Sequence, residues 1–426
     1  MFTRKSATVL AMATLSLCLT GQISAQTYTT LANFNFSDGD LPIGGLFLGT
    51  DGNFYGTTVE GGTNPCIVDR THSRPNGVNE GCGTIFKITP GGALTSLHSF
   101  DGKDGEYPES GVIQGKDGNF YGTTQSGGAV TTCDATSQIP GCGTIFKITS
   151  TGTFTSLHSF QMTDGAIPAR KLVQGTDGNF YGGTSSGGAN GDGTVFKITP
   201  SGTLTTLHSF DGTDGEGVSV GLALGTDGNF YGVTGGGGAY GLGTVFKITS
   251  GGTLTTLHSF CAAGGYCPDG YLPNALVLGA NGNFYGTTSE GGTGGLPNFE
   301  PSGTVFEITP AGKLTTLVNF NNQNNASPGY PLLDGLVQAS DGNFYGLTLA
   351  GGSGNGCGTG GCGALYKMTP AGTMTVVYDF LGQPDPGLIQ GANGDFYAET
   401  DSLQGGGDYG SVYSLSIGLA PLVDAQ

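Results

Sequence analysis

Four of the five histidines occupy the same place in a repeated motif, "LHSF". Each copy belongs to a different repeat, so these imidazoles are expected to lie far apart. A metal site needs several ligands that converge on one point. The sequence therefore predicts a structural role for the set, which consists of His98, His158, His208 and His258.

The fifth histidine has a different setting. His72 falls in the segment "DRTHSRP", where Arg70 and Arg74 flank it. A guanidinium group presents a planar fork of donors that suits carboxylate or phosphate groups, so this cluster could bind an anion. A solvated surface loop is the alternative interpretation of the same residues.

Acidic residues gather in two related segments, "DGKDGE" at 101–106 and "DGTDGE" at 211–216. Calcium prefers sites rich in carboxylate and carbonyl oxygens, which makes both segments candidate calcium sites. The spacing is not that of an EF-hand loop, and Asp-Gly is also ordinary turn chemistry. No other cofactor is indicated. The candidate ligands are Asp101, Asp104, Glu106, Asp211, Asp214 and Glu216.

The cysteines beyond residue 25 form close pairs along the chain. An even number in an exported protein indicates disulfide bonds. A zinc site would need four ligands in one place, whereas these pairs fall in different repeats without neighbouring histidines. No thiol would then remain as a nucleophile. The predicted pairs are Cys66–Cys82, Cys133–Cys142, Cys261–Cys267 and Cys357–Cys362.

The first residues are typical of a secretory signal peptide. Arg4 and Lys5 precede a short apolar run, and the small residues Ser24 and Ala25 follow it, which predicts cleavage after Ala25. No second apolar span follows, so no transmembrane segment is predicted in the mature protein. The mature chain would carry 12 basic and 32 acidic residues, a formal charge of −20. Such a surface should repel nucleic acid and anionic lipid.

One heptapeptide recurs along the chain. "TDGNFYG" stands at residues 50–56, 176–182 and 226–232, and near copies bring the total to seven. Internal repeats indicate units that bury their apolar faces against one another. A complete unit, residues 221–260, divides into four short segments that are rich in β-branched and aromatic residues and bounded by turn residues, which predicts four strands. The Phe and Tyr of the motif are predicted to pack between adjacent units, and its last Gly to let neighbouring backbone approach.

The order of the segments predicts how the repeats close. The third-strand motif, "GTVFKIT" and its variants, occurs seven times, but the last copy has no fourth strand after it. The missing copy, "YTTLANF" at 28–34, precedes the first unit. A strand from the N-terminus would therefore complete the last sheet and leave no open edge. A linear solenoid, the alternative, has no use for a displaced strand.

We therefore predict an all-β fold, a seven-bladed β-propeller of four-stranded antiparallel blades. The predicted signal peptide covers residues 1–25, the propeller residues 26–418 and a short tail residues 419–426. The blocks "DGNFYGTT", "GTVFKITPSGTLTTLHSF" and their copies resemble the GloVer repeat of choice-of-anchor tandem-repeat proteins, and the strand–turn–strand "LALGTDGNFYG" resembles NHL-type blades. The resemblance implies an exported bacterial protein and no established activity. The sequence ends in "SLSIGLAPLVDAQ", without an apolar tail or sorting signal, so a secreted or periplasmic form is expected.

All variation in length falls in two connections of the repeat. The one between the second and third strands covers residues 59–82 in the first unit and 125–142 in the second, but is much shorter in the third and fourth. In an up-and-down blade the two variable connections lie on the same face, which would also carry all four disulfides. Loops on a rigid scaffold often carry function, although neutral drift is the alternative.

The start of the innermost strand is the second candidate for a site, because this position differs in every repeat. A catalytic or metal site there would need several histidines or carboxylates, and only Asp334, with Glu109 near by, qualifies. Arg170 and Asn274 are further candidate binding residues at this channel mouth. The residues at the position are Gly44, Ser110, Arg170, Val220, Asn274, Asp334 and Pro386.

Three functional hypotheses follow. The first is a monomeric, non-catalytic binding scaffold that recognises an extracellular glycan or protein through the variable face. The second is a hydrolase or lyase that acts on an extracellular polymer at the channel mouth. The third is a structural component of the cell envelope, which would self-associate. The sequence alone does not choose the ligand.

Overall fold

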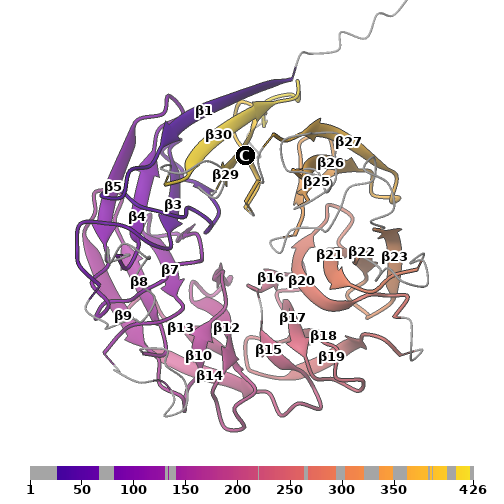
Figure 1. Cartoon of the computed structure of the whole chain (residues 1–426). Coiled ribbons are helices and arrows are strands. Elements are labelled where there is room, and N and C mark those ends of the chain that lie inside the picture. Colours follow the sequence, from indigo (N-terminus) through magenta and orange to yellow (C-terminus); the bar gives the residue numbers. More distant parts are fainter. Residues whose placement is uncertain are drawn as a thin grey trace, which may run out of the picture.

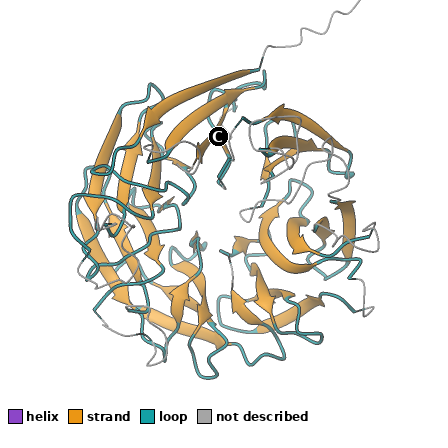
Figure 2. Cartoon of the chain, in the orientation of Figure 1, coloured by secondary structure: helices purple, strands orange, loops and turns teal. Residues whose placement is uncertain are grey.

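The chain forms a closed ring of seven antiparallel sheets (Figure 1). The computed structural model describes residues 26–66, 81–129, 133, 141–218, 220–262, 267–293, 303–320, 335–348, 362–381, 384–385, 387–400 and 409–422. Within these residues every regular element is a strand, and Figure 2 shows only strands and loops in this described part. The predicted seven-bladed β-propeller is confirmed.

Strands with the same role in their blades have similar lengths. The innermost strands are β2 (Phe47–Leu48), β6 (Ile113–Gln114), β11 (Val173–Gln174), β16 (Ala223–Leu224), β20 (Tyr271–Leu278), β24 (Val337–Gln338) and β28 (Ile389–Gln390). The second strands are β3 (Phe54–Thr58), β7 (Phe120–Thr124), β12 (Phe180–Ser186), β17 (Phe230–Gly236), β21 (Phe284–Glu290), β25 (Phe344–Leu347) and β29 (Phe396–Thr400). The third strands are β4 (Thr84–Ile88), β8 (Thr144–Ile148), β13 (Thr194–Ile198), β18 (Thr244–Ile248), β22 (Thr304–Ile308), β26 (Ala364–Met368) and β30 (Ser411–Ser416). The outer strands are β5 (Leu94–Ser99), β9 (Phe154–Ser159), β14 (Leu204–Ser209), β19 (Leu254–Ser259), β23 (Leu314–Asn319), β27 (Met374–Asp379) and β1 (Thr27–Asn33). Blades are numbered 1 to 7 in the order of their innermost strands.

On entering a blade, the chain first runs beside the C-terminal half of the second strand and only then reaches the innermost strand at the channel. In blades 3 and 4 this lead-in forms separate strands, β10 (Ala166–Pro168) and β15 (Glu216–Val218), which pair with β12 and β17. In blade 5 one strand, β20, serves both purposes, and its register shifts between Pro273 and Leu276. The residues between the two halves therefore lie at the mouth of the channel.

The ring closes through the displaced N-terminal strand, as predicted. Strand β1 pairs antiparallel with β30, from Thr27 opposite Ser416 to Asn33 opposite Ser411. Figure 1 shows the two strands side by side where the chain ends meet. Residues of the predicted tail reinforce this junction, because the Leu422 amide donates a hydrogen bond to the Ala392 carbonyl at 3.1 Å.

Adjacent blades are joined by contacts between aromatic rings. The tyrosine of each repeat motif packs against the phenylalanine of the next blade, with ring centroids 3.8 Å apart for Tyr55 and Phe120. Four of the seven pairs are stacked and three are tilted. Offset aromatic pairs contribute about 0.5–1.5 kcal/mol beyond the area they bury. The predicted packing of this pair between blades is confirmed. The complete ring of contacts comprises Tyr55–Phe120, Tyr121–Phe180, Tyr181–Phe230, Tyr231–Phe284, Tyr285–Phe344, Tyr345–Phe396 and Tyr397–Phe54.

The glycine after these two aromatic residues has a different role from the predicted one. A Cβ atom on Gly56 would lie 2.5 Å from Cζ of Phe86, and one on Gly122 would lie 2.5 Å from Cζ of Phe146. Both phenylalanines belong to the third strand of the same blade. The glycine therefore makes room for that ring within its own sheet, and not for backbone of a neighbour.

A carboxylate in the same blade holds the hydroxyl of the motif tyrosine. In blade 1, Tyr55 Oη donates to Asp51 Oδ2 at 2.7 Å, and Asn53 Nδ2 donates to the same oxygen at 2.8 Å. Burial would raise the pKa of Asp51, but these hydrogen bonds and the charge of Lys87 outweigh it and lower the pKa. The tyrosine–carboxylate bond recurs at Asp117, Asp177, Asp227 and Asp341.

In blade 5 the carboxylate comes from a different strand. Asn281 stands where blades 1 to 4 and blade 6 have the turn aspartate, and Glu307 stands where those blades have the third-strand lysine. Tyr285 Oη and Asn283 Nδ2 both donate to Glu307 Oε1, at 2.9 and 2.8 Å. Burial and the hydrogen bond to Glu307 raise the pKa of Tyr285 to about 12. The tyrosine hydroxyl and the asparagine amide thus keep a carboxylate acceptor, although this carboxylate comes from the third strand and not from the turn.

This exchange predicts strong coupling between positions 281 and 307. Asn281→Asp alone would place two carboxylates together and remove the 3.1 Å bond from Asn281 Nδ2 to Glu307 Oε1, so we expect it to lower the free energy of unfolding by about 1–2 kcal/mol. Asn281→Asp with Glu307→Lys should restore it to within about 0.5 kcal/mol, because the pair then matches the other blades. A double-mutant cycle by urea denaturation measures the coupling, and additive effects would contradict it.

The turn carboxylates predict a loss of stability in acid. Burial would raise the pKa of Asp341, but hydrogen bonds from Lys367, Asn343 and Tyr345 lower it to about 2. This folded-state pKa lies below the unfolded value of about 3.9. The contribution of Asp341 to the free energy of unfolding is therefore complete above about pH 3.9 and is lost as the pH falls toward 2. Urea midpoints measured from pH 6 to pH 2.5 should fall more steeply for the natural chain than for Asp341→Asn. Parallel curves would show that this carboxylate does not contribute.

Candidate functional site

Disulfide bonds fasten the variable connections in the part of the chain that the structure describes. Three predicted pairs are confirmed, with sequence separations of 16, 9 and 6 residues: Cys66–Cys82, Cys133–Cys142 and Cys261–Cys267. Cys362 is also disulfide-bonded, while its predicted partner Cys357 lies outside the described residues. Each bond closes a loop between the second and third strands or between two blades.

Two of the candidate residues at the channel mouth meet. Arg170 Nη2 lies 3.3 Å from Glu109 Oε2, and both side chains are about one-fifth exposed. Gln125 Nε2 donates to the same carboxylate oxygen. The contact joins the lead-in of blade 2 to that of blade 3, so it exists only because the two blades are neighbours in the ring.

A cleft opens beside this ion pair. It has a volume of about 260 Å³, and its walls combine polar and apolar side chains from blades 2 to 5. Asn274 is almost fully buried there and donates from Nδ2 to Ser289 Oγ at 3.1 Å. The lining residues are Gln125, Ile167, Pro168, Ala169, Arg170, Ser185, Val218, Val220 and Asn274. The structure thus brings Glu109, Arg170 and Asn274 to one region.

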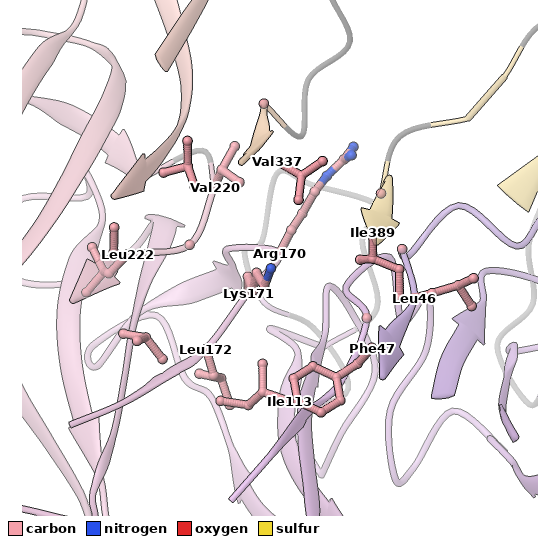
Figure 3. Close-up of a pocket in the computed structure, with 18 of the residues that line it drawn as sticks. Leu46, Phe47, Ile113, Arg170, Lys171, Leu172, Val220, Leu222, Val337 and Ile389 are labelled. Atoms are coloured by element: carbon pink, nitrogen blue, oxygen red, sulfur yellow. The ribbon is translucent and has the colours of Figure 1, made fainter. Parts of the chain in front are cut away.

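A second cavity fills the centre of the ring. Its volume is about 580 Å³, and all seven blades contribute residues to its wall. Figure 3 shows the side chains of Arg170 and Lys171 projecting into a space that aliphatic side chains enclose. Representative apolar residues of the wall are Leu46, Ile113, Leu172, Leu222, Val337 and Ile389.

The four repeated histidines have structural roles, as predicted. His98 Nε2 lies 2.8 Å from Asp104 Oδ2, and its ring stacks on Phe154 of the next blade at 3.9 Å. Burial would raise the pKa of Asp104, but the hydrogen bond to His98 and another from the Asp101 amide lower it. Equivalent pairs are His158–Asp164, His208–Asp214 and His258–Asp269.

The candidate calcium ligands are partly used in these contacts. Asp104 Oδ1 accepts from the Asp101 amide at 3.0 Å, and Asp101 Oδ1 accepts from the Lys103 amide at 2.9 Å. Asp211 and Asp214 form the matching turn in the next-but-one connection. Glu106 is buried beside Cys66, with Oε1 3.0 Å from Sγ, whereas Glu216 is exposed. In the described part of the chain, the one group of three potential metal ligands is Cys66, Cys82 and Glu106, and two of these form a disulfide.

Several candidates lie outside the described residues, namely Arg70, His72, Arg74 and Asp334. Two residues that the sequence reasoning overlooked lie at the site instead. Lys171 borders the central cavity and Gln125 contacts Glu109. Lys171 follows Arg170 directly, and two adjacent basic residues in so acidic a chain were a signal that could have indicated it.

The fold and its sequence motifs define a β-propeller that is built from repeats and has connections of variable length. The sequence profile of the Gloeobacter/Verrucomicrobia repeat matches the chain in overlapping segments at residues 19–216, 71–296, 130–359 and 269–420. The chain therefore belongs to this repeat family, which confirms the resemblance to GloVer repeats. No curated protein gives a significant sequence match.

Solved structures with the same fold are distant in sequence. The extracellular domain of BT4673, a one-component-system protein from B. thetaiotaomicron, has a TM-score of 0.52 and 11% identity over 92% of this chain. The chain spans only 40% of the length of that protein. The periplasmic gluconolactonase PpgL of Pseudomonas aeruginosa has a TM-score of 0.50 and 15% identity, covering 81% of this chain and 87% of its own. At such identities the likeness shows the fold alone.

Among the described residues, no helix is long and apolar enough to cross a membrane.

The geometry of the acidic turns predicts how calcium affects the protein. Because His98 and a backbone amide already occupy Asp104, we expect the melting temperature to be the same in calcium and in EDTA. Asp104→Asn should lower the free energy of unfolding by about 1–2 kcal/mol under both conditions, since it weakens both hydrogen bonds. A rise in melting temperature with calcium that Asp104→Asn abolishes would instead establish a calcium site.

Proposed function

We propose that this protein is an exported, non-catalytic recognition module that binds its ligand with the variable face, at the cleft beside Arg170. Of the two ligand classes considered, glycan and protein, a glycan fits this cleft better. The observation that carries the proposal is that side chains from blades 2, 3 and 5 converge there from positions that the repeat does not hold constant.

The chemistry of the cleft supports a glycan ligand. Gln125, Asn274 and Arg170 line the cleft with amide and guanidinium groups that each hold one partner within the protein, and Ser185 adds a hydroxyl group. Ile167, which is partly exposed, supplies apolar surface in the same cleft. A sugar ring presents hydroxyl groups on its edge and C–H groups on its faces, and binding sites usually combine apolar walls with a few placed polar groups.

Export is supported by the disulfide bonds. Structural disulfides persist in oxidising compartments and are rare in reducing ones. The three bonds between described cysteines and the bond at Cys362 agree with the signal peptide that the sequence predicts. A secreted or periplasmic location remains the proposal.

A hydrolase or lyase that acts on an extracellular polymer is the second candidate. Glycoside cleavage ordinarily uses two carboxyl groups on either side of the scissile bond. Glu109 supplies one carboxylate at the mouth and is ion-paired with Arg170, while the other candidate, Asp334, lies outside the described residues. The binding role therefore rests on more of the residues that are in place.

A binding experiment tests the proposal. The chain without its predicted signal peptide is screened against glycans and envelope extracts, alongside Arg170→Gln, Asn274→Ala and the control Lys103→Gln, an exposed residue of the same face. We expect Arg170→Gln to bind about tenfold more weakly or worse, because a hydrogen bond to a charged group contributes about 1.5–3 kcal/mol. Asn274→Ala should bind about threefold to tenfold more weakly, because a neutral hydrogen bond contributes about 0.5–1.5 kcal/mol. The control should bind normally.

Other outcomes would redirect the proposal. A variant with connections 59–82 and 125–142 cut to the length of the third unit tests the loops themselves. Binding that survives in the trimmed variant and in both cleft variants would exclude this face. Polymer cleavage would favour the enzyme, and self-association in sedimentation, without any ligand, would favour a structural envelope component.

A further inference from the structure

The central cavity differs in chemistry from the cleft beside it. It is more than twice as large, at about 580 Å³ against about 260 Å³. Its wall is built from the innermost strands, whose aliphatic residues also pack between blades. An apolar cavity of this kind gains little from water and readily accepts an apolar guest.

The polar amides of the wall are already committed. Gln114 Oε1 accepts from the Thr50 amide at 2.9 Å, and its Nε2 donates to the Gly118 carbonyl at 3.0 Å. Gln174 repeats this arrangement with the Lys116 amide and the Gly178 carbonyl, both at 2.9 Å. Each glutamine thus ties its own turn to the turn of the preceding blade. The cavity therefore offers few hydrogen-bonding groups to a sugar.

The charge in the wall is entirely positive. Of the described residues that line the cavity, the charged ones are Arg170 and Lys171, although the whole chain carries a formal charge of −18. Arg170 is paired with Glu109. Lys171, in contrast, is exposed and has no ion-pair partner among the residues that the structure describes. An ammonium group beside apolar surface favours an anion that brings its own apolar body.

We propose that the central cavity binds a long-chain carboxylate, with its head group on Lys171 and its alkyl chain along the aliphatic wall. Arg170 lies at the same end and adds a second donor. The remaining blades provide the apolar surface for the chain, including Leu222, Val337 and Ile389. This site adjoins the proposed glycan cleft and shares Arg170 and Val220 with it, whereas Lys171 and Val337 line the central cavity alone.

Calorimetry with simple alkyl carboxylates tests this site in the full chain. Octanoate, decanoate and dodecanoate are titrated below their micelle concentrations, with decyltrimethylammonium as the cationic counterpart. We expect affinity to rise roughly fourfold for each added methylene, the increment for burying one such group. Decyltrimethylammonium should bind at least about tenfold more weakly than decanoate, because its charge has the wrong sign.

Matched variants locate the site. Lys171→Gln should weaken decanoate binding about tenfold, and Val337→Phe should weaken it further by filling the cavity. The controls are Lys103→Gln, which removes an equal charge elsewhere, and Leu381→Phe, which adds a ring at a residue that is 77% exposed. Melting temperatures show that the variants are folded.

The outcomes separate this proposal from the preceding one. Asn274→Ala should leave decanoate binding unchanged, so glycan and carboxylate binding can fail independently. Decanoate binding that is absent, that persists in folded Val337→Phe, or that decyltrimethylammonium matches would overturn the proposal.

Discussion

The contacts between Tyr and Phe rings of adjacent blades are the interaction on which the rest of the structure depends. Six of the seven innermost strands contain only two residues, so backbone pairing near the channel is slight and the blades must be held by lateral packing. Each tyrosine is fixed at its other end by a hydrogen bond in its own blade, as Tyr55 is by Asp51 at 2.7 Å. Each tyrosine side chain is therefore held both by its aromatic face and by its hydroxyl group. This makes the rim of the channel rigid enough to support a binding site.

The fold was predictable because its determinants are local and repeated. One turn sequence, one aromatic pair and one displaced strand were sufficient to predict the blades and their closure. The role of Gly56 was wrongly predicted, because a sequence does not reveal whether the atom that approaches a glycine belongs to a neighbouring backbone or to Phe86 of the same sheet. Asn281 in place of the turn aspartate and Glu307 in place of the third-strand lysine look like two unrelated changes in the sequence. The register of β21 and β22, which places residue 285 opposite residue 307, shows that they are linked.

The candidate site was only partly predictable, for a different reason. Variation between repeats indicated the mouth of the channel, and it led to Arg170, Glu109 and Asn274. It could not show that Arg170 and Glu109, which are 61 residues apart in sequence, are in contact. Lys171 was missed because it lies just before a strand of only two residues. The alternation of side chains between the two faces of a strand predicts their direction only in longer strands.

The basic residues of blade 3 stand out because the fold does not require them. At the corresponding positions blade 1 has Gly44 and Gly45, and blade 4 has Val220 and Gly221. Small residues suffice there, since a Cβ on Gly111 would meet the Gly45 carbonyl oxygen at 2.4 Å, so the chain is already close-packed from blade to blade. Lys171 is exposed, so holding its long side chain in one position costs conformational entropy that a small residue would not cost. Such a residue is best explained by what it meets in the channel, and it sets the rim of blade 3 apart from the repeated surface around it.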